Sequence, residues 1–269
     1  MSNELQTLVD NFLQFYAANK HKSELNQITD FILSHALSAR GFNNFRNQEE
    51  SGEFFFINEV LAKSKPKLCI DIGANGGEYS LSLLKSTEAQ VIAFEPLPTA
   101  FEILKENTQQ FSNRIKLENL GIGSKEEELL INYNPNSTEH ASFCKEVDEI
   151  DYLSNKNQIA AHLVTLDSYF EKNKIKEIDL IKIDVEGFES EVFAGSKETF
   201  SKIRPKFIQI EFNWHQLFRN NSLHFFSKQL PGYKTYQLIP QGWIKREPRD
   251  PLSNIFMFSN FVFVRSDVA

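Results

Sequence analysis

The feature that most restricts how this chain folds is an alternation, from residue 68 onward, of short apolar runs with longer amphipathic stretches. Runs such as LCIDI and LIKID lack a clean alternation of apolar and polar residues, as expected of parallel strands buried on both faces. The alternation predicts an α/β fold with a doubly wound sheet. The expected strands are 68–72, 91–95, 115–119, 180–184, 207–212, 234–239 and 260–264, with helices between the first five.

Two parts of the chain depart from this pattern. Residues 1–65 carry apolar residues at spacings of three and four, which predicts a helical N-terminal extension, including a helix over 54–62, ahead of a domain that covers 66–269. This extension could cover the active-site mouth, supply a dimer surface or pack on the sheet. Residues 133–163 are rich in Asn and Ser and show little periodicity, which predicts a substrate-facing loop or lid, since such a length is unusual unless functional.

Composition narrows the classes of function. The 269 residues include 29 Lys and Arg against 36 Asp and Glu, a formal charge of −7. This balance argues against nucleic acid as a partner, because affinity for phosphate backbones comes from basic residues. With only Cys69 and Cys144, the chain can build neither a disulfide framework nor a multi-cysteine metal site. We recognise no export signal and no membrane span, and therefore expect a cytoplasmic protein.

The first predicted strand leads into a glycine-rich turn, CIDIGANGGEYS, of a kind that binds nucleotides. Its glycines let the backbone turn sharply and let a ligand approach closely. Asp71 would repel a dinucleotide pyrophosphate, whereas S-adenosylmethionine carries an ammonium and a sulfonium group. The turn therefore favours S-adenosylmethionine over NAD. The predicted cofactor residues in it are Asp71, Gly73, Asn75, Gly77, Tyr79 and Ser80.

Two further strand ends complete the predicted cofactor site. Glu95 ends the second strand, where a carboxylate can accept hydrogen bonds from both ribose hydroxyls, and Pro96 then turns the chain. Asn119 and Leu120 follow the third strand, where adenine can lie between apolar side chains. In the alternative interpretation, the acids only cap helices or turns and the glycines only make tight connections.

The segment DLIKIDVEGFE places acids at the carboxyl end of strand 180–184, where open α/β sheets bind ligands. Asp184, which we also expect to contact the cofactor, or Glu186 would receive the acceptor proton or hold a divalent cation that lowers the hydroxyl pKa. Lys182 needs a partner in a buried strand, and Asp184 is the nearest by the two-residue pleat. In the alternative, these three residues form only a structural ion-pair network.

Strand 207–212 adds a second group of polar residues at the same edge. His215 is the predicted general base, because imidazole titrates near neutral pH. Glu211 and Trp214, together with His140 of the long loop, are expected to bind the acceptor. Oxygen ligands suit magnesium, so a Mg²⁺ site could also form here, although nothing in the spacing requires a metal. Its predicted ligands are Asp184, Glu186, Glu211 and His215.

The chain resembles the FkbM family of S-adenosylmethionine-dependent methyltransferases over roughly residues 66–264. The resemblance rests on IDIGANGGEYS (70–80), AFEP (93–96), TLDSYF (165–170), DLIKIDVEGFE (179–189), RPKFIQIE (204–211) and NFVFV (260–264), in that order. It implies a Rossmann-like class I methyltransferase fold with a seven-stranded, mostly parallel sheet and helices on both faces. It also implies S-adenosylmethionine as methyl donor and usually a hydroxyl acceptor on a sugar or natural product. The paired glycines at 76 and 77 are a mild departure from the family turn.

We therefore expect an O-methyltransferase that acts on a sugar, a glycan or a secondary metabolite. N- or carboxyl-methylation of a small metabolite, a cofactor-binding scaffold without turnover and NAD-dependent sugar oxidation remain alternatives. A homodimer is compatible with the helical extension. A small basic cluster, formed by Lys245, Arg246 and Arg249, could contact a nucleotide-sugar pyrophosphate or have no ligand.

Overall fold

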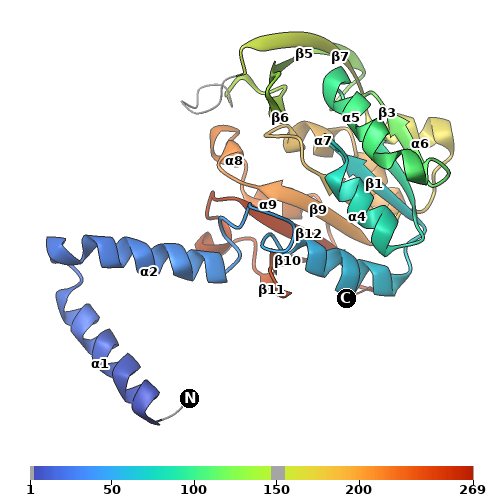
Figure 1. The fold of residues 1–269 in the computed structure, drawn as a ribbon. Helices are drawn as coiled ribbons and strands as arrows, with labels where there is room; N and C mark the ends of the chain where they lie inside the picture. Colours follow the sequence, from blue (N-terminus) through green and yellow to red (C-terminus); the bar gives the residue numbers. More distant parts are fainter. Residues whose placement is uncertain (1–2, 147–154, 269) are drawn as a thin grey trace.

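An eight-stranded sheet with helices on both faces forms the centre of the molecule (Figure 1). The structure is a computed structural model that describes residues 3–146 and 155–268. The strand order is β11-β10-β12-β9-β8-β1-β2-β3; the five strands from β9 to β3 run parallel, and the other three pair antiparallel. The strands are β1 (Leu68–Ile72), β2 (Gln90–Phe94), β3 (Ile115–Glu118), β8 (Leu180–Ile183), β9 (Phe207–Phe212), β10 (Tyr233–Ile239), β11 (Gly242–Arg246) and β12 (Ser259–Arg265).

The helices of the body cover the two faces of this sheet and bury an apolar core on each. Consecutive strand residues alternate between the two cores: Leu180 packs with Phe56 and Leu83 on one face, whereas Ile181 packs with Phe170 and Phe193 on the other. This alternation explains why the parallel strands read as continuous apolar runs. The body helices are α3 (Glu53–Phe55), α4 (Glu78–Ser86), α5 (Pro98–Thr108), α6 (Leu166–Asn173), α7 (Glu189–Ala194), α8 (His215–Phe218) and α9 (Leu223–Lys228).

All seven predicted strands are present, and helices connect the first five as expected. The predicted count of seven is too low, however, because β11 adds an eighth strand at the edge of the sheet. The sequence signal for β11 is weak. Only Pro240 and Gln241 separate it from β10, without the Asn-Gly or Asp-Gly pair that marks a hairpin. Lys245 and Arg246 also give it the charged character of an edge strand.

The described part of residues 133–163 is not the structureless loop predicted from its composition. It contributes to a second sheet of order β4-β7-β5-β6, above the first in Figure 1. Its strands are β4 (Gly121–Ile122), β5 (Glu127–Asn134), β6 (Ser137–Ser142) and β7 (Asn157–Val164). In β7, Ile159, Ala161 and Leu163 alternate with more exposed residues, a period of two that the surrounding polar residues obscure. Residues 147–154 of the predicted loop lie outside the described residues.

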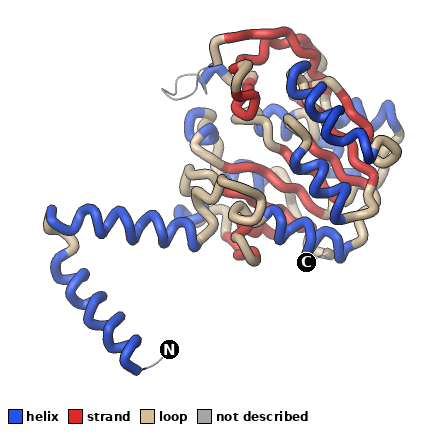
Figure 2. Tube along the Cα trace, viewed as in Figure 1, coloured by secondary structure: helices blue, strands red, loops and turns tan. Residues whose placement is uncertain are grey.

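The N-terminal extension is helical, as expected, but its two parts differ in their packing. Helices α1 (Asn3–Asn19) and α2 (Asn26–Ala39) project from the body (Figures 1 and 2). After them, α3 continues as a π-helical turn (Phe56–Leu61) and a 3₁₀ turn (Ala62–Ser64), and Phe56, Ile57 and Leu61 are buried in the core. The division of the chain at residue 65 stays a prediction. Among the described helices, none has the length and apolar character needed to cross a membrane.

Candidate active site

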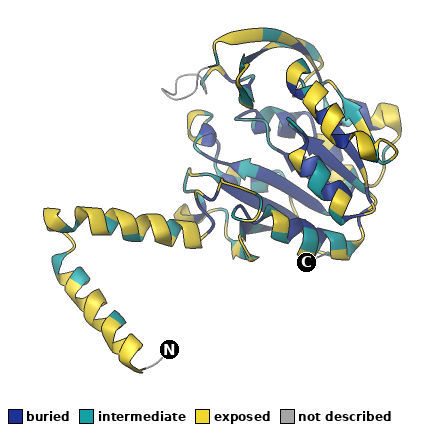
Figure 3. Cartoon of the chain, in the orientation of Figure 1, coloured by how far each residue is buried: buried dark blue, intermediate teal, exposed yellow. Residues whose placement is uncertain are grey.

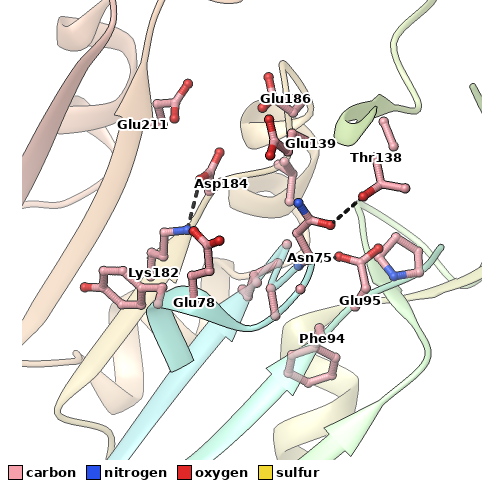
Figure 4. Close-up of a pocket in the computed structure, with 18 of the residues that line it drawn as sticks. Asn75, Glu78, Phe94, Glu95, Thr138, Glu139, Lys182, Asp184, Glu186 and Glu211 are labelled. Atoms are coloured by element: carbon pink, nitrogen blue, oxygen red, sulfur yellow. Dashed lines mark hydrogen bonds and ion pairs between the residues drawn. The ribbon is translucent and has the colours of Figure 1, made fainter. Parts of the chain in front are cut away.

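A cavity of about 760 Å³ opens at the carboxyl ends of the parallel strands. The strand order reverses at β1, which pairs with β2 on one side and β8 on the other, and α/β sheets bind ligands at such a reversal. Figure 4 shows the parts of the wall made by the turn after β1, the ends of β2, β8 and β9, and the second sheet. Side chains from residues 45–53 also line the cavity. The cavity therefore lies where α/β sheets bind ligands, and residues 45–53 and the second sheet complete its wall.

The turn after β1 depends on glycine where the backbone passes closest to β8. Gly73 has φ +81, and a Cβ there would lie 1.8 Å from the carbonyl oxygen of Asp184. Gly77 starts α4 with φ +88 and, unlike Gly73, does not line the cavity. Asn75 lines it, and its Oδ1 accepts a hydrogen bond of 2.9 Å from Thr138 Oγ1 of β6. The second sheet is thereby attached to the glycine-rich turn after β1.

Glu95 lies at the floor of the cavity, where β2 ends. Its two carboxylate oxygens accept backbone N–H groups from Asn75 at 2.7 Å and Leu97 at 2.8 Å. Burial raises the pKa of Glu95 to about 7 against these hydrogen bonds. A carboxylate has about four lone-pair sites, so acceptor capacity remains for a ligand. Asn119 Nδ2 donates to the Glu95 carbonyl at 2.7 Å and so holds this turn; its predicted contact with the cofactor remains a prediction.

Pro96 and Leu120 line the cavity, whereas Asp71 and Ser80 lie outside its wall. Asp71 is completely buried and accepts a hydrogen bond of 2.7 Å from Ser80 Oγ. Its Oδ1 lies 4.0 Å from Lys182 Nζ. Burial raises the pKa of this carboxyl, although Lys182 and Ser80 oppose the shift. Asp71 therefore sits beneath the turn, and its predicted direct contact with the cofactor remains a prediction.

Lys182 has the partner predicted for it. Its Nζ lies 2.9 Å from Asp184 Oδ2 and 4.8 Å from the ring centroid of Tyr79. Although burial opposes ionisation, the charges of Asp184 and Asp71 raise the pKa of Lys182. Tyr79 lines the cavity, and its Oη donates to Gln209 Oε1 at 2.6 Å. The buried ammonium thus compensates part of the negative charge of the wall.

Three carboxylates meet in the cavity wall where β8 and β9 end (Figure 4). Asp184, Glu186 and Glu211 each offer an oxygen within 4.8 Å of the others. We call them the carboxylate cluster. Burial, then the charges of Asp184 and Glu186, raise the pKa of Glu211 well above its ordinary value. The structure thus brings together three of the four predicted metal ligands.

The two predicted histidines flank Glu186 and lie outside the cavity wall. His215 is buried, with Nδ1 3.1 Å from Glu186 Oε2, and its ring packs on Trp214. His140 Nδ1 lies 3.8 Å from Glu186 Oε1. Burial opposes ionisation of Glu186, but its interactions with both histidines hold its pKa below the ordinary value. The roles predicted for His140, Trp214 and His215 as acceptor ligands or base remain predictions.

Sequence reasoning missed a large part of the wall. Residues 45–53 come from the extension, yet they approach the cavity because Gln209 Nε2 of β9 donates to Glu53 Oε1 at 2.8 Å. The available signal was a polar, glycine-containing stretch, NNFRNQEESGE, between two helical patterns. The basic cluster does not line the cavity; Arg246 Nε donates to Gln237 Oε1 instead. The unpredicted lining residues include Phe45, Arg46, Asn47, Gln48, Ser51, Glu53, Glu78, Thr138, Glu139, Phe258 and Asn260.

This arrangement of strand ends, glycine turn and acids coincides with a family match. Residues 71–234 match the family described as the methyltransferase FkbM domain. The chain belongs to the FkbM methyltransferase family. The predictions of a methyltransferase and of a Rossmann-like fold are confirmed. Membership of this family implies S-adenosylmethionine as the methyl donor.

Two curated relatives and one solved structure illustrate the similarity. Over 201 residues the chain is 28% identical to the 2-O-methyltransferase NoeI of Sinorhizobium fredii, covering 69% of this chain and 79% of NoeI. Over 140 residues it is 25% identical to the hexuronic acid methyltransferase AglP of Haloferax volcanii, covering 52% of this chain and 54% of AglP. The METTL16 MTase domain aligns with a TM-score of 0.45 and 13% identity, covering 79% of this chain and 66% of that domain.

Proposed function

We propose that this FkbM methyltransferase transfers the methyl group of S-adenosylmethionine to a hydroxyl group of a sugar or glycan. The observation that carries the proposal is one cavity that joins the turn at Gly73 and the buried Glu95 to the carboxylate cluster. The name of one relative, a 2-O-methyltransferase, supports transfer to oxygen, and that of another, a hexuronic acid methyltransferase, supports a sugar acceptor.

The cofactor would occupy the half of the cavity between β1 and β3. Glu95 would accept the ribose hydroxyls with its remaining lone pairs, and adenine would lie beside Leu120. The methionine part of the cofactor would lie beside the backbone of the turn at Gly73, which lines the cavity. This placement directs the sulfonium toward Asp184 and leaves the other half of the cavity for the acceptor.

The carboxylate cluster would remove the acceptor proton. The hydroxyl oxygen attacks the methyl carbon in line, the carbon–sulfur bond breaks, and neutral S-adenosylhomocysteine leaves; the proton passes to a carboxylate. We assign this role to Glu211. Asp184 is paired with Lys182, and Glu186 with two histidines, whereas Glu211 accepts a hydrogen bond from the neutral amide of Asn213. His215, which contacts Glu186, is then a positioning residue.

Two assays test this function. Calorimetric titration should show binding of S-adenosylmethionine and S-adenosylhomocysteine, and no binding of NAD. A screen of sugars and glycans should then yield a methylated product with a new O-methyl group by mass spectrometry and NMR. Glu211→Gln should lower kcat about 10²-fold or more without changing cofactor affinity. Binding of NAD alone, or methyl transfer to nitrogen, would refute the proposal.

A divalent cation is a second way for the same cluster to activate the hydroxyl. Magnesium takes oxygen ligands and lowers the pKa of a bound hydroxyl, and Asp184, Glu186 and Glu211 supply carboxylate oxygens at suitable spacing. We propose this cluster as the Mg²⁺ position. Turnover should then fall on treatment with EDTA and return with added Mg²⁺. If turnover is unchanged after EDTA, no divalent cation takes part, and proton transfer to the carboxylate is the remaining way to activate the hydroxyl.

A further inference from the structure

The wall of the cavity is strongly acidic. Among the described residues that line it, seven carry a carboxyl group and two, Arg46 and Lys182, carry a basic group. S-adenosylmethionine suits such a wall with its sulfonium and ammonium groups, but it also carries an α-carboxylate, which the acids would repel. That carboxylate therefore needs a cation beside it. The seven acids are Glu53, Glu78, Glu95, Glu139, Asp184, Glu186 and Glu211.

Lys182 is already occupied by acids of the protein. Its Nζ lies 2.9 Å from Asp184 Oδ2 and 4.0 Å from Asp71 Oδ1, and its side chain is 8% exposed. If this ammonium moved to a ligand, Asp71 and Asp184 would lose their cation, which is costly for buried charges. Lys182 is therefore a poor partner for the cofactor carboxylate.

Arg46 is the other cation of the wall, and its charge is available to a ligand. It is exposed, and within residues 3–146 and 155–268 no group forms a hydrogen bond or an ion pair with its guanidinium. A guanidinium is always charged in proteins and offers parallel N–H donors that match the two oxygens of a carboxylate. Arg46 thus has both the charge and the donors that the cofactor carboxylate needs.

The segment that carries Arg46 is fixed to the body, unlike the helices before it. Helices α1 and α2 contain no buried residue among those that the structure describes (Figure 3). Phe42, Asn44 and Ser51 follow these helices and are buried. Buried residues on both sides therefore hold the backbone of Arg46 in the cavity wall.

Contacts of its neighbours place Arg46 between α4 and the start of β12. Gln48 Oε1 accepts a hydrogen bond of 2.6 Å from Ser82 Oγ, one turn into α4. The ring of Phe45 contacts that of Phe258, just before β12. Helix α4 begins directly after the glycine-rich turn, beside which the methionine part of the cofactor is proposed to lie. The amino-acid end of the cofactor would thus face the segment that carries Arg46.

We infer that the guanidinium of Arg46 binds the α-carboxylate of S-adenosylmethionine. The inference rests on the cofactor placement proposed above, and it adds a cofactor residue outside the family match, which covers residues 71–234. Glu95 would hold the ribose, and Arg46 would hold the opposite end of the same molecule.

Calorimetry with three ligands tests this inference. Arg46→Met should weaken the binding of S-adenosylmethionine and S-adenosylhomocysteine about 10–100-fold, as expected for loss of a hydrogen-bonded charge. Decarboxylated S-adenosylmethionine lacks only the carboxylate, so its affinity should stay within twofold of that of the wild type. Arg46→Lys keeps the charge but loses the paired donors, and it should have an intermediate effect.

Arg249→Met is the matched control, because Arg249 is also exposed and lies outside the cavity wall. This variant should bind all three ligands as the wild type does. Urea unfolding of Arg46→Met should also match that of the wild type, because the exposed side chain loses no described partner.

Other results overturn the inference in distinguishable ways. Equal loss of affinity for all three ligands would show that Arg46 supports the wall rather than the carboxylate. Unchanged affinities with a raised acceptor KM would assign Arg46 to the acceptor. A wild-type protein that binds none of the three ligands would refute the proposed cofactor itself, and this inference with it.

Discussion

The backbone carbonyl of Asp184 and the missing side chain of Gly73 determine how closely β1 and β8 approach beside the cavity. A Cβ at residue 73 would stand 1.8 Å from that carbonyl oxygen, which is rigid backbone. Gly76 is different, because a Cβ there would be 3.4 Å from the flexible Ile103 side chain and its φ is not in the left-handed region. Residue 73 therefore requires glycine, whereas residue 76 has room for a Cβ.

Gly73→Ala should destabilise the fold by more than the roughly 1–3 kcal/mol of a strained φ, because a steric clash adds to it. It should also abolish measurable cofactor binding, since β8 must move. Gly76→Ala is the matched control and should change both quantities little. Urea unfolding and calorimetry measure the two effects. Equal behaviour of the two variants would show that the turn does not depend on the close approach.

Glu95 should make cofactor affinity depend on pH. Burial raises its pKa to about 7 in the free protein, and ribose hydroxyls donate to the ionised form. Binding therefore favours loss of the proton, and affinity should rise with pH through 7. The expected gain from pH 6 to pH 8 is about tenfold by proton linkage.

Glu95→Gln should bind more weakly at pH 8 and lose this pH dependence. Glu189 is the control: burial raises its pKa to about 7 as well, but it does not line the cavity. Glu189→Gln should therefore keep the pH dependence. Calorimetry at several pH values measures these affinities. The same slope in wild type and Glu95→Gln would place the ribose elsewhere.

His215 contacts the site through Glu186. His215→Ala should lower kcat about 10–100-fold, as loss of outer partners of reactive groups commonly does, while cofactor affinity stays within twofold. His162→Ala, with an exposed histidine side chain, is the control. Steady-state kinetics measures kcat, and calorimetry measures cofactor affinity. A change in cofactor affinity with kcat unaltered would remove His215 from the reaction.

At the scale of helices and strands, the sequence predicts the elements whose periodicity is strong and misses those made of polar residues. The runs LCIDI and LIKID identify β1 and β8 because burial on both faces requires apolar residues throughout. Strand β6, with the sequence STEHAS, has no apolar alternation and pairs only with β5 in its sheet, so its residues predict a loop.

The residues of the candidate site also divide into those that the sequence predicts and those that it misses. Motif residues at strand ends, such as Gly73, Glu95 and Asp184, follow from topology, because parallel strands end at one edge. The direction of a side chain does not follow from topology. Asp71 and Ser80 turn beneath the sheet edge to meet each other, and His215 packs behind Glu186. Long-range contacts such as Glu53 with Gln209 have no local signal.

Phe45 should therefore affect the acceptor and not the cofactor. Phe45 is 60% exposed at the cavity and contacts Phe258 edge to face, with ring centroids 6.1 Å apart. Phe45→Ala should raise the acceptor KM several-fold and leave cofactor affinity unchanged. Phe54→Ala, at an exposed residue that does not line the cavity, is the control. If Phe45→Ala changes cofactor affinity and leaves the acceptor KM normal, the cofactor and acceptor halves of the cavity have been assigned the wrong way round.

At the scale of the whole molecule, the cavity wall extends beyond the family region in both directions along the chain. The family match covers 71–234, whereas Phe45, Glu53, Phe258 and Asn260 of the wall lie outside it. The methyl donor would thus be kept while the acceptor changes, because Phe45 and Phe258 lie outside the matched region. Substitutions confined to these two residues would give this chain a new acceptor range and leave the turn at Gly73 and the buried Glu95 untouched.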